Sequence, residues 1–208
     1  MDDKHYLQSL IREGEHRQQD FKYRVTDAGK LAKSVSAFAN TDGGRLLIGV
    51  RDDGHLSGVR SEEEIFMMHQ AAYKYCRPEA DIKFETYHVD GRTIVIATIP
   101  PSSRRPVCAL ADDDRPRAYI RINDENIVAS PVHLALWRES LSARGAMLTY
   151  DDNIRRLLSV IQGQLTLNHI VRQSRLPRHT VITLLARLIR FGVVRCEYAG
   201  QQFLFSQA

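Results

Sequence analysis

The last quarter of the chain carries an order of elements that few folds accommodate. Hydrophobic residues recur at helical spacing in three short segments, and two strands follow them. The five segments lie at 152–161, from 167, at 178–191, at 193–198 and at 202–205. Three helices and then a β-hairpin is the order of a winged helix-turn-helix. We therefore predict that fold for residues 146–208.

The third of these helices, 178–191, carries the candidate DNA contacts. Its buried stripe is separate from a polar face that runs along the helix. In a winged helix-turn-helix, the first residues of this helix meet base edges, and arginines further along meet phosphates. The expected base contacts are Arg178, His179, Thr180 and Thr183. The expected phosphate contacts are Arg187 and Arg190.

Positive charge is concentrated in the same part of the chain. Residues 150–208 hold eight Arg and no Lys against three acidic residues, a net charge of +5. The other 149 residues carry 21 basic and 22 acidic side chains, a net charge of −1. This asymmetry is expected of a segment that meets phosphates. The alternative is a solvated arginine-rich face on a winged helix that only joins proteins.

The first 143 residues have the pattern of a mixed α+β domain. Strands 82–89 and 92–99 are joined by Asp90-Gly91, which favours a tight hairpin. Residues 100–116 indicate an exposed loop. The other expected strands are 19–25, 45–50 and 117–122, and the expected helices are 3–13, 28–39, 61–75 and 131–143. We place the domains at 1–145 and 146–208.

Several motifs of the first domain are specific as an ordered series. In chain order they are Gly14-Glu15, Asp20-Phe21-Lys22, Ser36 to Gly44, Ile48 to Gly54, Gly58-Val59 and Ala118 to Asn123. Over about residues 8–140 this succession resembles the Schlafen AlbA-type family. The resemblance implies an Alba-like DNA-binding domain. It also implies a regulator, because many bacterial proteins with this domain carry a helix-turn-helix behind it.

The resemblance further implies a set of acidic residues. Schlafen-family members that cut RNA use three carboxylates, and the matching positions here are Glu15, Asp20 and Asp52, with Lys22 beside them to steady a phosphate. Such a cluster can hold Mg²⁺ or Mn²⁺, which positions water for phosphodiester cleavage. Asp20 departs from the family pattern, because Glu is usual there. The alternative is that Glu15 and Asp20 are surface acids and Asp52 is a turn residue.

Other functional classes find little support. The three cysteines are far apart in the sequence, which predicts reduced thiols in a cytoplasm and neither a disulfide framework nor a metal knuckle. The eight histidines have no metal-binding spacing. No apolar run approaches the about 18 residues of a membrane span. We expect no cofactor unless the carboxylates hold Mg²⁺ or Mn²⁺.

The sequence thus predicts a cytoplasmic bacterial DNA-binding protein, a transcriptional regulator that acts on double-stranded DNA. A homodimer is expected, because one short recognition helix buries too little surface for tight specific binding. The first alternative is a metal-dependent endonuclease that acts on structured RNA. The second is a protein-interaction adaptor. The sequence specifies neither a DNA site nor an effector.

Overall fold

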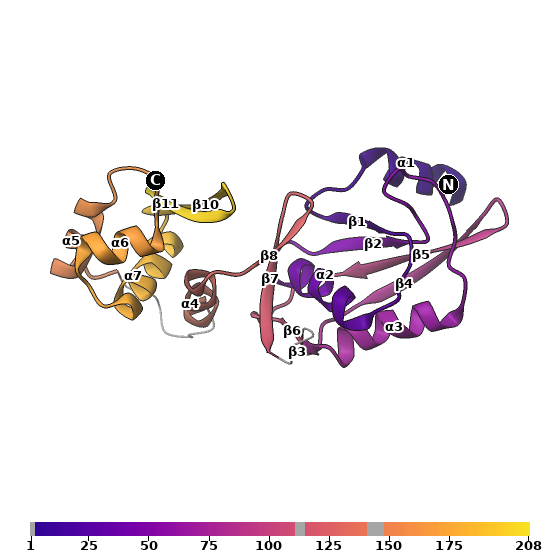
Figure 1. Ribbon diagram of the computed structural model, residues 1–208, viewed down its shortest axis with the longest axis horizontal. Coiled ribbons are helices and arrows are strands. Elements are labelled where there is room, and N and C mark those ends of the chain that lie inside the picture. The colour runs from indigo at the N-terminus through magenta and orange to yellow at the C-terminus, as the bar shows by residue number, and fades with distance from the viewer. Residues whose placement is uncertain (1–2, 111–114, 141–147) are drawn as a thin grey trace. The chain divides into compact units, whose positions relative to one another are not determined.

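The computed structural model describes residues 3–110, 115–140 and 148–208. The chain divides into two compact units, Met1–Val128 and Ala129–Ala208 (Figure 1). Among the helices of the described ranges, none has the length and hydrophobicity that a membrane span requires. All three cysteines are free thiols.

The first unit is built on a four-stranded sheet with the order β1-β2-β5-β4. These strands are Gln19–Lys22, Gly44–Ile48, Arg92–Ile99 and Lys83–Val89, respectively. β1 and β2 are parallel, and the other pairs are antiparallel. Asp90 and Gly91 both have positive φ, at 51° and 72°. Positive φ at both central residues is the geometry that two-residue hairpins favour, and the predicted hairpin is confirmed.

Helices cover both faces of this sheet, with α1 on one side and α2 and α3 on the other (Figure 1). The helices are Asp3–Glu13, Ala28–Asn40 and Glu62–Tyr73. Successive strand residues point to opposite faces. Leu47 of β2 therefore packs with α1, whereas Leu46 and Ile48 pack with α2. This double coverage explains why the strand is apolar at every central position.

A second sheet packs against the far side of α2. Its order is β3-β6-β7-β8, formed by Cys76–Arg77, Cys108–Leu110, Pro116–Ile122 and Glu125–Val128. β6 lies inside the stretch that the sequence predicts to be an exposed loop, and that expectation is wrong for these residues. α2 is buried on almost every side, because it packs in a single hydrophobic core with strands of both sheets. Small residues such as Ala32 and Ala37 allow this close approach.

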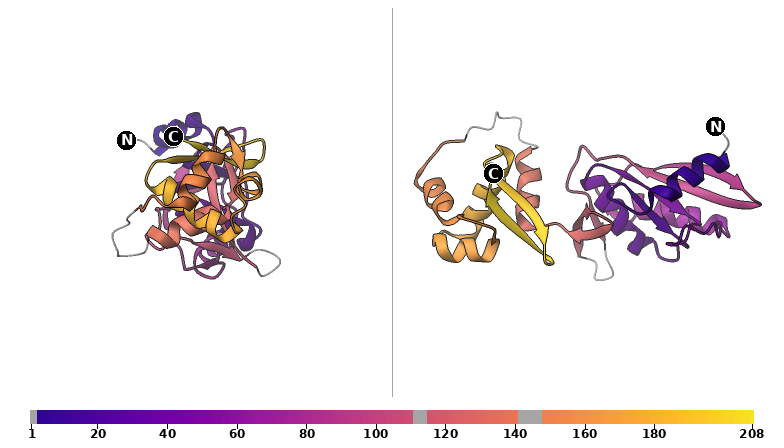
Figure 2. Two further views of the ribbon diagram at one scale, coloured as in Figure 1. Left: turned by 90° about the vertical axis from the view of Figure 1, so that its left-hand side faces the viewer. Right: turned by 90° about the horizontal axis from the view of Figure 1, so that it is seen from above.

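The second unit contains four helices and a three-stranded sheet within its described residues. The helices are α4 Pro131–Ser140, α5 Asp152–Val160, α6 Leu167–Ser174 and α7 Arg178–Arg190. The sheet order is β10-β11-β9, with strands Val194–Ala199, Gln202–Gln207 and Leu165–Thr166. The β10–β11 hairpin forms a ribbon beside the helices (Figure 2).

Local capping accounts for the bounds of these helices. Asp151 accepts a hydrogen bond from the backbone N–H of Ile154 at 2.8 Å, so Asp151 is the cap of α5. Thr166 caps α6, because its side chain accepts a hydrogen bond from the backbone N–H of His169. Gly192, after the end of α7, has a positive φ of 69°, which suits a glycine at a helix C-terminus.

α4 belongs to the core of the second unit. Val132, Ala135 and Leu136 of this helix pack in one cluster with apolar residues of α5, α6 and α7. The contacts divide the chain between Val128 and Ala129, whereas the sequence pattern places a boundary at 145 and this helix in the first domain. Helical periodicity shows that residues are amphipathic but not which core they join. Residues 141–143, the end of the expected helix, lie outside the described ranges.

Candidate functional site

α7 turns one face to the core and leaves another exposed. Val181, Leu185 and Leu188 are fully buried. Arg178 and His179 are exposed, and the more central Thr180 and Thr183 are partly buried. The four residues expected to meet bases therefore lie together on the N-terminal half of α7, away from its buried stripe.

The first turns of α7 have few internal partners. Arg178 Nη1 donates to Asn168 Oδ1 of α6 at 2.7 Å, and the Thr183 hydroxyl donates to the backbone carbonyl of His179 at 3.0 Å. Within the described part of the chain, no ion pair engages Arg178 or His179. Arg172 and Arg175, at the end of α6 and just after it, are also exposed. This end of α7 thus presents positive charge that no described carboxylate neutralises.

The two arginines further along α7 have an internal partner in α4. Arg187 Nε donates to Glu139 Oε1 at 2.8 Å, and Arg190 Nη1 donates to the backbone carbonyl of Glu139 at 3.0 Å. Cations at the last turn of a helix are also favoured by the helix dipole. The sequence-based expectation of phosphate contacts is therefore incomplete, because a phosphate at these two arginines would compete with Glu139.

In the first unit, Glu15 and Asp20 are neighbouring carboxyl groups at β1, and Glu15 Oε1 accepts a hydrogen bond from the backbone N–H of Phe21 at 2.8 Å. Burial, reinforced by the hydrogen bond to Asp20, raises the pKa of Glu15 to about 6. Burial alone would also raise the pKa of Asp20, but the hydrogen bond from Glu15 and the charges of Lys22 and Arg121 lower it. Because the two pKa values are shifted in opposite directions, a single proton shared by the pair is held by Glu15 rather than by Asp20.

Two cations hold the Asp20 carboxylate. Lys22 Nζ lies 2.6 Å from Oδ2, and Arg121 Nη2 lies 3.4 Å from Oδ1. Asp20 and Arg121 are both almost completely buried, with exposed fractions of 4% and 2%. The two cations offset the charge of this buried carboxylate, so a metal ion bound to Asp20 would have to compete with Lys22 and Arg121.

Asp52 lies in the exposed turn after β2. Across residues 3–110, 115–140 and 148–208, no three or more His, Cys, Asp or Glu side chains are placed to hold a metal ion together. The structure thus brings Glu15 and Asp20 together but does not join Asp52 to them. The donor set does not fit the Mg²⁺ or Mn²⁺ site that the resemblance implies.

The segment that ends α2 has a structural task. Asn40 Nδ2 donates to the carbonyls of Val107 at 2.7 Å and Tyr119 at 2.9 Å, and Asn40 Oδ1 accepts from Val107 N at 2.8 Å. The Thr41 hydroxyl oxygen accepts from the backbone N–H of Arg121 at 2.9 Å. These side chains attach the end of α2 to β7 and to Val107, the residue before β6. Sequence reasoning does not reveal these partners.

The first unit is an α+β fold in which a buried helix lies between two sheets. Residues 15–130 match the model of the family described as Schlafen, AlbA_2. Because this match covers more than half of the chain, the chain belongs to that family, as its motifs predict. No curated protein matches the chain significantly.

The solved structures that are similar to the chain include two from bacteria. The DIP2311 protein from Corynebacterium diphtheriae is 17% identical with a TM-score of 0.48, and the match covers 90% of this chain and 34% of that protein. The N-terminal domain of an ATP-dependent DNA helicase RecG-related protein from Nitrosomonas europaea is 20% identical with a TM-score of 0.43, with coverages of 72% and 96%. The chain therefore spans about a third of the length of the C. diphtheriae protein.

Proposed function

We propose that the chain is a DNA-binding protein whose second unit acts as a winged helix-turn-helix. The order α5-α6-α7-β10-β11, with β9 as a third strand, is the order of elements in that class. Membership of the Schlafen, AlbA_2 family supports a nucleic-acid-related function. A role in transcription, binding to double-stranded DNA as a homodimer and a cytoplasmic location are parts of the same proposal.

The observation that carries the proposal is the exposed N-terminal half of α7. Arg178 and His179 are exposed there without a described carboxylate partner, and Thr180 lies beside them. In this class of fold, side chains at these positions enter the major groove and reach base edges. Arg172 and Arg175 add charge near the same end of the helix. We assign base contacts to Arg178, His179, Thr180 and Thr183.

Arg187 and Arg190 have a secondary part in this proposal. Both donate hydrogen bonds to Glu139, so they can contact phosphate only if they exchange that partner. Phosphate contacts near the first turn of α7 do not require this exchange. We therefore expect Arg178 to contribute more to affinity than Arg187.

The test is a salt-titrated binding measurement on duplex DNA with the full chain. The double variant Arg178→Ala/His179→Ala should lower affinity about tenfold, and its salt dependence should decrease by about one unit of log–log slope, because one phosphate or base contact of a cation is lost. Arg12→Ala is the matched control, since Arg12 is an exposed arginine of α1 in the first unit. If the double variant binds as the wild type does, the α7 assignment is refuted.

A second measurement addresses the adaptor alternative and the homodimer. Sedimentation with and without duplex DNA reports the mass of the free chain and of the complex. Two chains per duplex support a symmetric dimer on two half-sites. A chain that shows no salt-dependent affinity for duplex DNA would favour the adaptor.

A further inference from the structure

Three arginines surround one tyrosine on the surface of the first unit. Tyr23 directly follows β1, and the guanidinium carbons of Arg51 and Arg24 lie 4.9 and 5.6 Å from the centre of its ring. Arg60 Nη2 donates to the Tyr23 hydroxyl at 3.1 Å. The arginines come from three segments: the residue after Tyr23, the turn after β2 and the residues before α3. We call these four residues the Tyr23 cluster.

The positive charge of the Tyr23 cluster is not neutralised. Arg24, Arg51 and Arg60 are all exposed, and in the part of the chain that the structure describes none has a carboxylate within ion-pair distance. A hydrogen bond from Arg51 and the charge of Arg60 lower the pKa of Tyr23. A phenol responds in this way where the local potential is positive. Like charges held close together without a counterion favour the binding of an anion.

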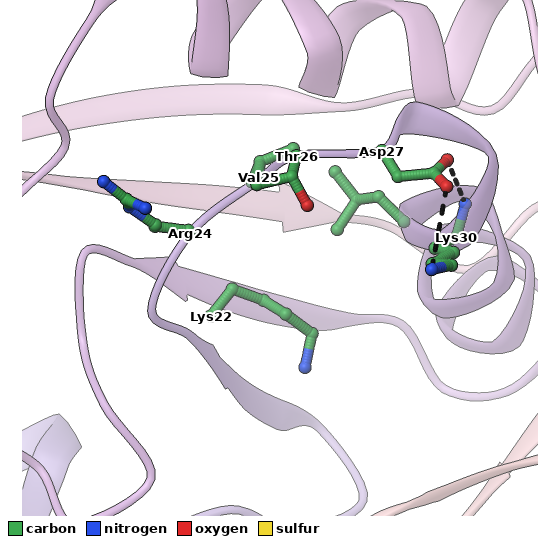
Figure 3. A pocket seen from close by; sticks show the side chains of 7 residues that line it. Lys22, Arg24, Val25, Thr26, Asp27 and Lys30 are labelled. Atoms are coloured by element: carbon green, nitrogen blue, oxygen red, sulfur yellow. Dashed lines mark hydrogen bonds and ion pairs between the residues drawn. The ribbon is translucent and has the colours of Figure 1, made fainter.

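The chain segment at the Tyr23 cluster borders two adjoining hollows. Arg24, Val25 and Thr26 line both of them. The first, of about 170 Å³, is also lined by Lys22 and Lys30, and Figure 3 shows these side chains around it. The second, of about 330 Å³, is lined by Arg60 and by the first turn of α3, including Glu63 and Glu64. Asp27 also lines the first, so the basic side of each hollow is the side on which an anion would bind. Each volume accommodates a group the size of a phosphate, and both share the basic side chain of Arg24.

The chemistry of the cluster favours a flexible, unpaired strand. A guanidinium stacked on an aromatic ring presents a flat cationic surface, on which exposed bases stack while outward N–H groups meet phosphates. Bases inside a duplex are not free to stack in this way. The cluster is also built into the first unit, so it does not depend on α7.

We propose that the Tyr23 cluster binds the phosphodiester backbone of single-stranded nucleic acid. Arg24, Arg51 and Arg60 contact phosphates, and Tyr23 orients their guanidinium planes. RNA and DNA share this backbone chemistry, so the two are separated by measurement.

The experiment compares the full wild-type chain with the triple variant Arg24→Ala/Arg51→Ala/Arg60→Ala. Fluorescence anisotropy is measured between about 50 and 200 mM salt with oligo(dT), with oligo(U) and with a duplex of equal length. Loss of three single-strand contacts should lower the log–log salt slope by about two units and affinity by about tenfold or more. Arg12→Ala is the matched control for the loss of a surface charge.

Circular dichroism and thermal unfolding establish that the triple variant is folded, which we expect because the three side chains are exposed. A loss with both oligo(dT) and oligo(U) supports a backbone site for either nucleic acid, and a loss with one of them identifies that nucleic acid as the one bound at the cluster. An unchanged slope and affinity on both probes overturns the proposal. So does an equal loss in Arg12→Ala, because the effect would then be one of net charge.

A third variant separates this site from α7. Arg178→Ala/His179→Ala should keep the single-strand binding that the triple variant loses. If it does so but also keeps duplex binding, the function proposed for α7 fails while the Tyr23 site stands. If it loses single-strand binding as fully as the triple variant does, the Tyr23 site is not independent, and the proposal is overturned.

Discussion

Replacement of Asn40 by alanine tests the structural task of the segment that ends α2. The side chain is 4% exposed and makes hydrogen bonds to the backbone of two distant residues. In Asn40→Ala, the buried N–H of Val107 loses its side-chain acceptor, which costs about 1–3 kcal/mol. The carbonyl of Val107 still accepts from the Ser36 hydroxyl at 2.8 Å, so it remains bonded.

Asn40 Nδ2 also donates hydrogen bonds to Val107 and Tyr119, and the loss of each lowers the free energy of unfolding by about 1 kcal/mol. The free energy of unfolding of the first unit should therefore fall by about 4 kcal/mol. For a unit of this size, that loss lowers Tm by on the order of 15 °C. The expected loss of stability does not depend on any contact between Asn40 and a ligand.

The assay is urea unfolding of the full chain, followed by far-UV circular dichroism, with the two units resolved as separate transitions where they differ. Asn153→Ala is the control, because Asn153 is an exposed amide in α5 and its loss should change stability by less than about 0.5 kcal/mol. A decrease of under about 1 kcal/mol in Asn40→Ala would refute the reasoning. It would show that water or rearranged backbone replaces the amide without cost.

Three more perturbations follow from described contacts. Gly44→Ala should destabilise the chain by about 1–3 kcal/mol in urea unfolding, because its Cβ would overlap the Phe38 ring. Gly163→Ala, where a Cβ meets nothing within 4 Å, is its control. Glu139→Gln should raise duplex affinity about two- to fivefold by freeing Arg187, given the modest strength of a half-exposed ion pair, and unchanged binding would argue against competition at Glu139. Glu15, whose folded pKa is raised to about 6, contributes stability that is complete below its ordinary pKa of 4.5 and is lost as pH rises through 6. Urea unfolding from pH 5 to pH 7 should therefore show a decline in the wild type that Glu15→Gln lacks, and parallel profiles would disprove the assignment.

Local patterns account for the parts of the fold that the sequence predicts. Asp90-Gly91 defines a hairpin because the turn type is set by two adjacent residues. Gly192 and Thr166 mark helix ends for the same local reason. β3 and β6 are two and three residues long, too short for any periodicity, so the second sheet cannot be predicted from alternation. α4 presents an apolar face whose partner only the tertiary structure identifies.

The candidate sites show the same division. The exposed and buried faces of α7 follow from helical spacing, and the structure places Arg178, His179 and the buried stripe accordingly. The partner of Arg187 is 48 residues away in the chain. Arg121, the buried partner of Asp20, is likewise remote in sequence. Charge pairs of this kind depend on packing, and a single sequence carries no trace of them.

The placement of α2 between two sheets also bears on the order in which the first unit is completed during synthesis. α2 leaves the ribosome long before β7, because the chain emerges from its N-terminus. Ser36 and Asn40 must wait for partners 67 to 83 residues later in the chain. Until Tyr119 has emerged, α2, which is buried on nearly every side in the folded unit, lacks the cover that β7 provides. The first unit can therefore complete its core only after β7 has been synthesised.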